Sequence, residues 1–124
     1  MEIIAEAKAD ERREFKRASL KEPVRFEFKD PQHFGGCVSG DISAGGIRLR
    51  VYDFIPLGTE LTLEVQLSSN RMVSCEGQVV WVEKIAFGDD YRIGLKFVNT
   101  PALREAQELI QHFVEFNRLQ GLKI

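Results

Sequence analysis

The chain has 124 residues, of which 44% are hydrophobic and 29% charged, and its formal net charge is −2. This length suits one domain, and the apolar content is enough for a buried core, which excludes two ordinary domains and a wholly disordered chain. The slightly acidic charge balance argues against a protein that coats DNA or RNA through a broad basic face, so any anion-binding site must be local.

The first residues show no targeting signal. No basic stretch leads into an apolar run after Met1, and no stretch of the chain reaches the roughly 20 consecutive apolar residues of a membrane-spanning helix. We therefore expect a cytoplasmic protein without membrane insertion. Residues 1–11 are expected to form a flexible tail and residues 12–124 a single domain, with its strands between about 23 and 98.

A basic segment precedes the first predicted strand. It contains Arg12, Arg13, Lys16, Arg17 and Lys21, and only one acid, Glu14. Arg13 and Arg17 are four residues apart, a spacing that places them on one side of a helical turn or of an extended chain. Guanidinium groups donate in bidentate fashion to phosphate or to the O6/N7 edge of guanine, so the spacing predicts an anion clamp. The alternative is a solvated surface segment, because two arginines at this spacing occur readily by chance.

Six strands are expected from the alternation of apolar and polar residues, which marks half-buried strands. They span about 24–29, 36–42, 47–52, 61–67, 72–83 and 93–97. In the longest of them, Val79 and Trp81 fall on the same side, and Gly77 is a candidate for a bulge or bend at a corner of the sheet. Cys37 and Cys75 lie in these strands without metal-ligand spacing, so both are expected to be reduced core thiols.

The turn after the second strand, Asp41-Ile42-Ser43-Ala44-Gly45-Gly46, carries complementary chemistry. Asp41 and Ser43 are two residues apart and therefore point to one side of an extended chain. A carboxylate accepts from the N–H donors of guanine's Watson–Crick edge, a hydroxyl can bond to a base, sugar or phosphate, and glycines let backbone N–H groups approach an anion. The alternative is a capped β-turn, since Asp, Ser and Gly form turns for purely local reasons.

One helix is expected over about 100–120. Leu103, Ala106, Ile110 and Phe113 recur at helical spacing, and Thr100-Pro101 is a typical helix start. Strands followed by one helix predict an all-β fold with a C-terminal α-helix. The expected architecture is a six-stranded antiparallel β-barrel, split and Greek-key-like, with the helix over an opening or along one side.

The two motifs together resemble the paired signature of the PilZ domain family, with Arg13-x-x-x-Arg17 before the first strand and Asp41-x-Ser43-x-x-Gly46 between strands. The resemblance continues through 77–82 and 91–97, which are similar to the family's last two strands, to the end of the helix. It implies a six-stranded antiparallel barrel that binds the bacterial second messenger cyclic di-GMP (c-di-GMP). This agrees with the barrel expected from the periodicity.

The resemblance also implies roles for single residues. Arg13 and Arg17 correspond to residues that grip phosphate and guanine. Asp41 and Ser43 correspond to residues that read a guanine, and Gly46 corresponds to a residue that shapes the turn.

Arg12 and Trp81 are further candidates for ligand contact. Arg12 resembles a residue of family members that hold two stacked ligand molecules per domain, with a single ligand as the alternative. Trp81 lies on a strand that lines the site in some members, whereas an aromatic residue in an alternating strand is otherwise a core residue. We expect no cofactor, no metal and no catalytic residue, because the sequence shows no metal-ligand cluster and no His beside a nucleophile in a recognisable motif.

These implications describe a receptor and effector for c-di-GMP, and not an enzyme. The basic N-terminal segment would become ordered over the barrel on binding, and the protein would signal by contact with an unidentified effector protein in control of motility, adhesion or exopolysaccharide. The alternative is a PilZ-like interaction module that does not bind nucleotide, against which the intact motifs argue. An oligonucleotide-binding barrel would need aromatic platforms among basic residues on its strands, and an enzyme would need a catalytic motif; the sequence shows neither.

Overall fold

The computed structural model describes residues 16–30 and 35–122, with side chains up to Leu119. Its strands form one sheet in the order β1-β4-β5-β8-β7-β6-β2-β3, and every neighbouring pair is antiparallel. The strands are β1 (Arg17–Ser19), β2 (Val24–Phe28), β3 (Gly36–Val38), β4 (Gly40–Ser43), β5 (Gly46–Val51), β6 (Glu60–Ser68), β7 (Arg71–Lys84) and β8 (Tyr91–Phe97). The helix is α2 (Leu103–Leu122).

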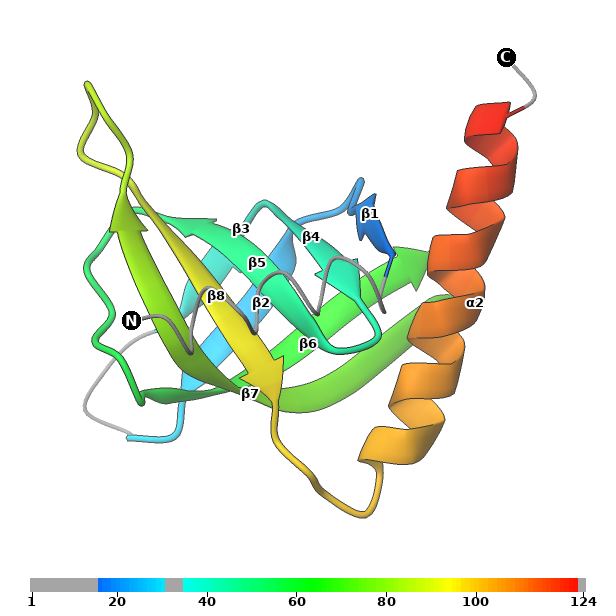
Figure 1. Cartoon of the computed structure of the whole chain (residues 1–124). Coiled ribbons are helices and arrows are strands. Elements are labelled where there is room, and N and C mark those ends of the chain that lie inside the picture. Colours follow the sequence, from blue (N-terminus) through cyan, green and yellow to red (C-terminus); the bar gives the residue numbers. More distant parts are fainter. Residues whose placement is uncertain (1–15, 31–34, 123–124) are drawn as a thin grey trace, which may run out of the picture.

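The sheet is curled around its core. Figure 1 shows a half-barrel with α2 along one side and the tip of the β7–β8 hairpin projecting at the other. α2 packs against β1, β4 and β7. The predicted fold class, all-β with a C-terminal helix, is therefore confirmed. Among the helical residues that the structure describes, none forms a segment both long and apolar enough to cross a bilayer.

The described residues form eight strands where six were predicted. One addition is β1, which lies in the basic segment and pairs with β4. The other arises because the run 36–42 divides at Ser39, whose carbonyl accepts a hydrogen bond from the backbone N–H of Arg50 at 3.0 Å. Before Ser39 the chain pairs with β2, and after it with β1 and β5. The alternation of side chains is the same for either partner, so periodicity alone does not reveal the change.

The inner face of the sheet carries the core. In β6 the predicted alternation is confirmed, because Leu61, Leu63 and Val65 are fully buried whereas Thr62 is exposed. Ile110 of α2 is also fully buried and closes the core from the side. Burying an isoleucine side chain contributes about 1.5–3 kcal/mol. The helix is therefore a structural part of the half-barrel.

The two cysteines differ in exposure. Cys75 is buried in the core as predicted, but Cys37 is exposed, so the prediction of two core thiols is wrong for Cys37. The reason is its side of β3, because Val38 points inward and is buried whereas Cys37 points outward, opposite the exposed Arg25 of β2. Adjacent residues of a strand lie on opposite sides, so only one of the two can face the core.

A β-bulge in β7 changes the direction of Trp81. Val79 pairs with Leu95 and Trp81 with Gly94, so Val80 is the extra residue in β7. One extra residue inverts the alternation, which leaves Val79 in the core and turns Trp81 to the outer face. The prediction that Val79 and Trp81 share a side is therefore wrong. The bulge also lies at Val80 and not at Gly77, which pairs regularly on both sides.

Candidate functional site

Asp41 accepts hydrogen bonds from two arginines on neighbouring strands. Nη1 of Arg17 lies 3.1 Å from Oδ1 of Asp41. Nε of Arg48 lies 2.9 Å from Oδ1 and 3.2 Å from Oδ2. The side chains are partly covered, with exposed fractions of 16% for Arg17, 28% for Asp41 and 39% for Arg48. Among the described residues, one carboxylate thus lies between two guanidinium groups.

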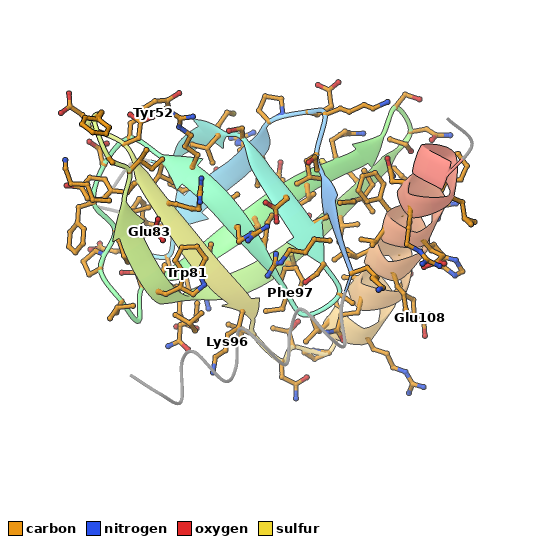
Figure 2. The ribbon with its side chains drawn as sticks, turned by 45° about the horizontal axis from the view of Figure 1, so that its top comes forward. Tyr52, Trp81, Glu83, Lys96, Phe97 and Glu108 are labelled. Atoms are coloured by element: carbon orange, nitrogen blue, oxygen red, sulfur yellow. The ribbon has the colours of Figure 1, made fainter. Side chains whose placement is uncertain are left out.

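These side chains share the outer face because of strand register. Asp41 lies opposite Arg48, Arg48 lies opposite Gly94, and Gly94 lies opposite Trp81. The four positions therefore form a row across β4, β5, β8 and β7. Figure 2 labels Trp81 and views the sheet from the side on which the indole can be seen. The bulge at Val80 thus places an aromatic ring on the same face as the charged cluster.

Ser43 stabilises the turn that follows β4. Its side chain is fully buried, its Oγ accepts from the backbone N–H groups of Gly45 and Gly46, and it donates to the carbonyl of Gly46, all at 3.3 Å. These are the contacts of a capped turn, one of the two interpretations that the sequence allows. The turn holds β4 and β5 in the register that brings Asp41 to Arg48.

Gly46 is required by close packing of the backbone. A Cβ at this position would lie 2.3 Å from the carbonyl oxygen of Leu95 on β8. Real Cβ atoms do not approach a backbone atom this closely, so β5 and β8 fit together only with glycine here. The close packing of β5 and β8 thus gives a reason for glycine here that is separate from the turn-shaping role implied by the resemblance.

Helix α2 is tied to the same turn. Nε2 of Gln107 donates to the carbonyl of Ala44 at 2.9 Å. Neither Gln107 nor Arg48 was among the residues singled out from the sequence. A signal for Arg48 exists, since it alternates with the apolar Ile47 and Leu49 directly after the glycine pair. It becomes informative only once the register of β4 and β5 is known.

The structure brings part of the predicted site together. Arg17, Asp41, Ser43 and Gly46 lie on adjacent strands, although Arg17 and Asp41 are 24 residues apart in sequence. Arg12 and Arg13 lie outside the described residues. In the described ranges, no group of three His, Cys, Asp or Glu side chains is arranged to hold a metal ion.

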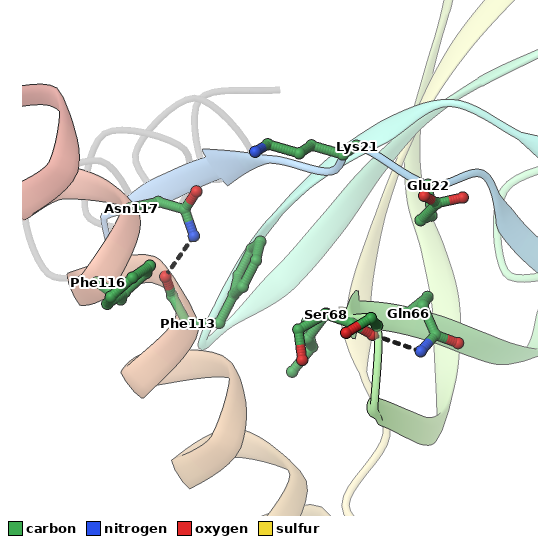
Figure 3. A pocket seen from close by; sticks show the side chains of 9 residues that line it. Lys21, Glu22, Gln66, Ser68, Phe113, Phe116 and Asn117 are labelled. Carbon is green, nitrogen blue, oxygen red and sulfur yellow. Dashed lines mark hydrogen bonds between the residues drawn. The ribbon is translucent and has the colours of Figure 1, made fainter.

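Two cavities of the described structure lie elsewhere. The larger, about 650 Å³, is bounded by Phe113 and Phe116 of α2, Lys21, and the turn that joins β6 and β7 (Figure 3). The second, about 460 Å³, lies between Phe26 and Phe54. Neither is lined by the cluster around Asp41, which lies on the outer face of the sheet.

Comparison with known proteins establishes the family. The sequence model of the PilZ domain matches residues 11–116. The chain belongs to the PilZ domain family. The matched range includes both motif segments, from Arg12 to Gly46. Among curated proteins, no sequence matches this PilZ domain.

Solved structures share its fold. The inhibitor of motility MotI/DgrA of Bacillus subtilis has a TM-score of 0.70 at 18% identity, and the match covers 86% of this chain and 51% of that one. YcgR of Escherichia coli, solved in complex with c-di-GMP, has a TM-score of 0.65 at 20% identity, with 90% of this chain and 50% of that one covered. This PilZ domain therefore spans about half the length of these two proteins.

A third structure matches over its whole length. It is a pathogenic protein of Xanthomonas campestris, described as a tetrameric PilZ domain self-assembled via a helical bundle. Its TM-score is 0.65 at 16% identity, and the match covers 97% of this chain and 99% of that one. At such identities the likeness concerns the fold alone. The eight described strands are consistent with that fold.

Proposed function

We propose that this PilZ domain is a non-enzymatic receptor for c-di-GMP in the bacterial cytoplasm. The observation that carries the proposal is the contact between Arg17 and Asp41, because it joins the two motif segments in space. The two segments supply complementary groups for one ligand, hydrogen-bond donors from arginine and acceptors from aspartate. Arginine donates to phosphate and to guanine O6/N7, and a carboxylate accepts from guanine N–H groups.

The outer face around Asp41 suits a ligand that is covered from a second side. We propose that the leading segment, with Arg12 and Arg13, becomes ordered over this face when the ligand's phosphates neutralise its charge. Arg17 is the natural anchor of this movement, since β1 begins there and pairs with β4. The outward indole of Trp81 would complete the contacts with the ligand, while Ser43 and Gly46 would hold the turn and strands that position Asp41.

The ordered segment, the ligand and the sheet would together form a surface that an effector protein recognises. Motility, adhesion and exopolysaccharide production are the proposed outputs. Similarity to an inhibitor of motility favours the first of them. The domain itself would act by contact, as a receptor module without a reaction of its own.

Isothermal titration with c-di-GMP tests the proposal. We expect Arg13→Ala and Arg17→Ala each to weaken binding by about 1.5–3 kcal/mol, the scale of a charge-assisted hydrogen bond, with binding also weakening as salt rises. Arg25→Ala is the matched control, because Arg25 forms an exposed ion pair with Glu27 on β2, away from the motif strands. If titration of the wild type gives no heat, the better description is a PilZ-like interaction module that does not bind nucleotide.

The ordering step has a separate readout. Amide exchange of residues 12–21 should slow when c-di-GMP saturates the protein, because ordered backbone is protected from solvent. Exchange at the unliganded rate in the saturated complex would contradict ordering while leaving binding intact.

A further inference from the structure

The two arginines hold Asp41 in different ways. Arg17 reaches one oxygen, whereas Nε of Arg48 lies within hydrogen-bond distance of both. Oδ1 therefore accepts from both arginines and Oδ2 from Arg48 alone. A carboxylate oxygen has two lone pairs, so Oδ1 is fully used and Oδ2 has room for one more donor.

Reading guanine requires both oxygens. The Watson–Crick edge of guanine presents two parallel donors, N1–H and N2–H, and a carboxylate accepts them as a pair. One of the two arginines must therefore release Oδ1 when Asp41 reads a guanine. The structure indicates which one stays.

Arg48 has the more firmly placed backbone of the two, although its side chain is the more exposed, at 39% against 16% for Arg17. It lies in β5, which is paired on both sides by β4 and β8, whereas Arg17 begins a three-residue strand at the edge of the sheet. Arg17 also has a new partner in the complex, since the proposed ligand offers it phosphate and guanine oxygen. Within the described residues, Arg48 makes its hydrogen bonds only with Asp41.

We propose that Arg48 is a positioning residue, which keeps the Asp41 carboxylate aimed at the ligand while Arg17 moves to it, and which thereby sets the preference for guanine over adenine. This rests on the proposed c-di-GMP function. Adenine presents N1 as an acceptor where guanine presents a donor, so a carboxylate held in one orientation repels it. A carboxylate free to turn pairs less well with guanine and still has no proton to donate to adenine N1, so the discrimination narrows through weaker guanine binding.

Affinities of Arg48→Ala for c-di-GMP and for cyclic di-AMP test this inference. We expect c-di-GMP binding to weaken by about tenfold with cyclic di-AMP binding unchanged, so that the selectivity ratio falls by about tenfold as well. Arg48→Lys keeps the charge but lacks the planar Nε donor, so it should regain affinity without regaining the ratio. Arg50→Ala is the control, since Arg50 is the next outward arginine of β5 and pairs with Asp90; it should behave as wild type.

A double-mutant cycle separates positioning from a general effect of charge. If Arg48 acts through Asp41, then Arg48→Ala should leave the selectivity ratio unchanged in an Asp41→Asn background. A ratio that stays at the wild-type value in Arg48→Ala, or that falls equally in both backgrounds, overturns the inference. A wild-type protein that binds neither nucleotide overturns the proposed function instead, and with it this inference.

Discussion

The indole of Trp81 lies across the backbone of Gly94. A Cβ at Gly94 would come within 2.1 Å of Nε1 and 2.2 Å of Cε2 of the ring, and the two residues face each other in the register of β7 and β8. The missing side chain of Gly94 therefore provides the space in which the ring rests. Arg48 lies on the other side of Gly94, so this glycine also brings the ring toward the charged cluster.

Gly94→Ala should displace the indole. The new methyl group occupies the place of the ring, and the ring moves because it is a partly exposed side chain and not backbone. We expect a red-shifted emission spectrum, which reports on this residue alone since the chain has one tryptophan. The free energy of unfolding should fall by about 1–2 kcal/mol.

The matched control for this change is Gly88→Ala. A Cβ at Gly88 lies 3.9 Å from its nearest neighbour, the backbone nitrogen of Asp90, which is an ordinary contact. Emission from the control should equal that of the wild type. An unshifted spectrum in Gly94→Ala would show that the ring does not rest on this glycine.

Gly46→Ala should destabilise the fold itself. Its Cβ would meet a backbone oxygen, that of Leu95, and moving it requires β5 and β8 to separate. We expect the free energy of unfolding, measured in urea, to fall by about 3 kcal/mol. Gly36→Ala is the control and should change it little, because a Cβ at Gly36 would lie 3.6 Å from the ring of Phe26. Wild-type stability in Gly46→Ala would contradict the close approach. Loss of ligand binding in this variant would thus report on folding and not on a ligand contact.

The sequence predicts those parts of the fold that depend on burial of one face. Leu61, Leu63 and Val65 alternate because β6 has one side in the core, and Ile110 is predicted for the same reason at helical spacing. Such patterns are local, since every inward position meets the same environment. They are therefore visible without knowledge of the partner strand.

The features that the sequence does not predict depend on distant partners. The division at Ser39 is a change of neighbour, and the bulge at Val80 exists only relative to β8. The direction of Trp81 and the pairing of Arg48 with Asp41 follow from that register. The spacing of Asp41 and Ser43 predicts that both side chains lie on one side of their strand. It does not predict which residues of β5 lie opposite them.

Stability should depend on pH through Cys75. Burial, and to a smaller extent the neighbouring charge of Glu76, raise the pKa of this thiol from 9.0 to about 12. Between these values the unfolded chain has lost a proton that the folded chain retains, so stability is fully present below pH 9 and falls as pH rises toward 12. The loss approaches about 1.4 kcal/mol per pH unit within this window.

Urea unfolding of wild type and Cys75→Ala from pH 8 to 10.5 measures this effect. Other groups titrate equally in both proteins, so the difference between the two curves isolates the thiol. We expect the wild type to lose its advantage over the variant above pH 9. Parallel curves over the whole range would show that Cys75 ionises as readily in the folded protein as in the unfolded chain.

Gln107→Ala should loosen the turn that carries the motif glycines. The change removes the 2.9 Å hydrogen bond from Nε2 to the carbonyl of Ala44, at an expected cost of about 1 kcal/mol. The amides of Gly45 and Gly46 donate to Ser43 in this turn, so their hydrogen exchange should accelerate. Gln111→Ala, an exposed glutamine of the same helix, is the control and should leave both rates unchanged. Equal exchange in the two variants would mean that the turn is held by its own contacts and not by the bond to α2.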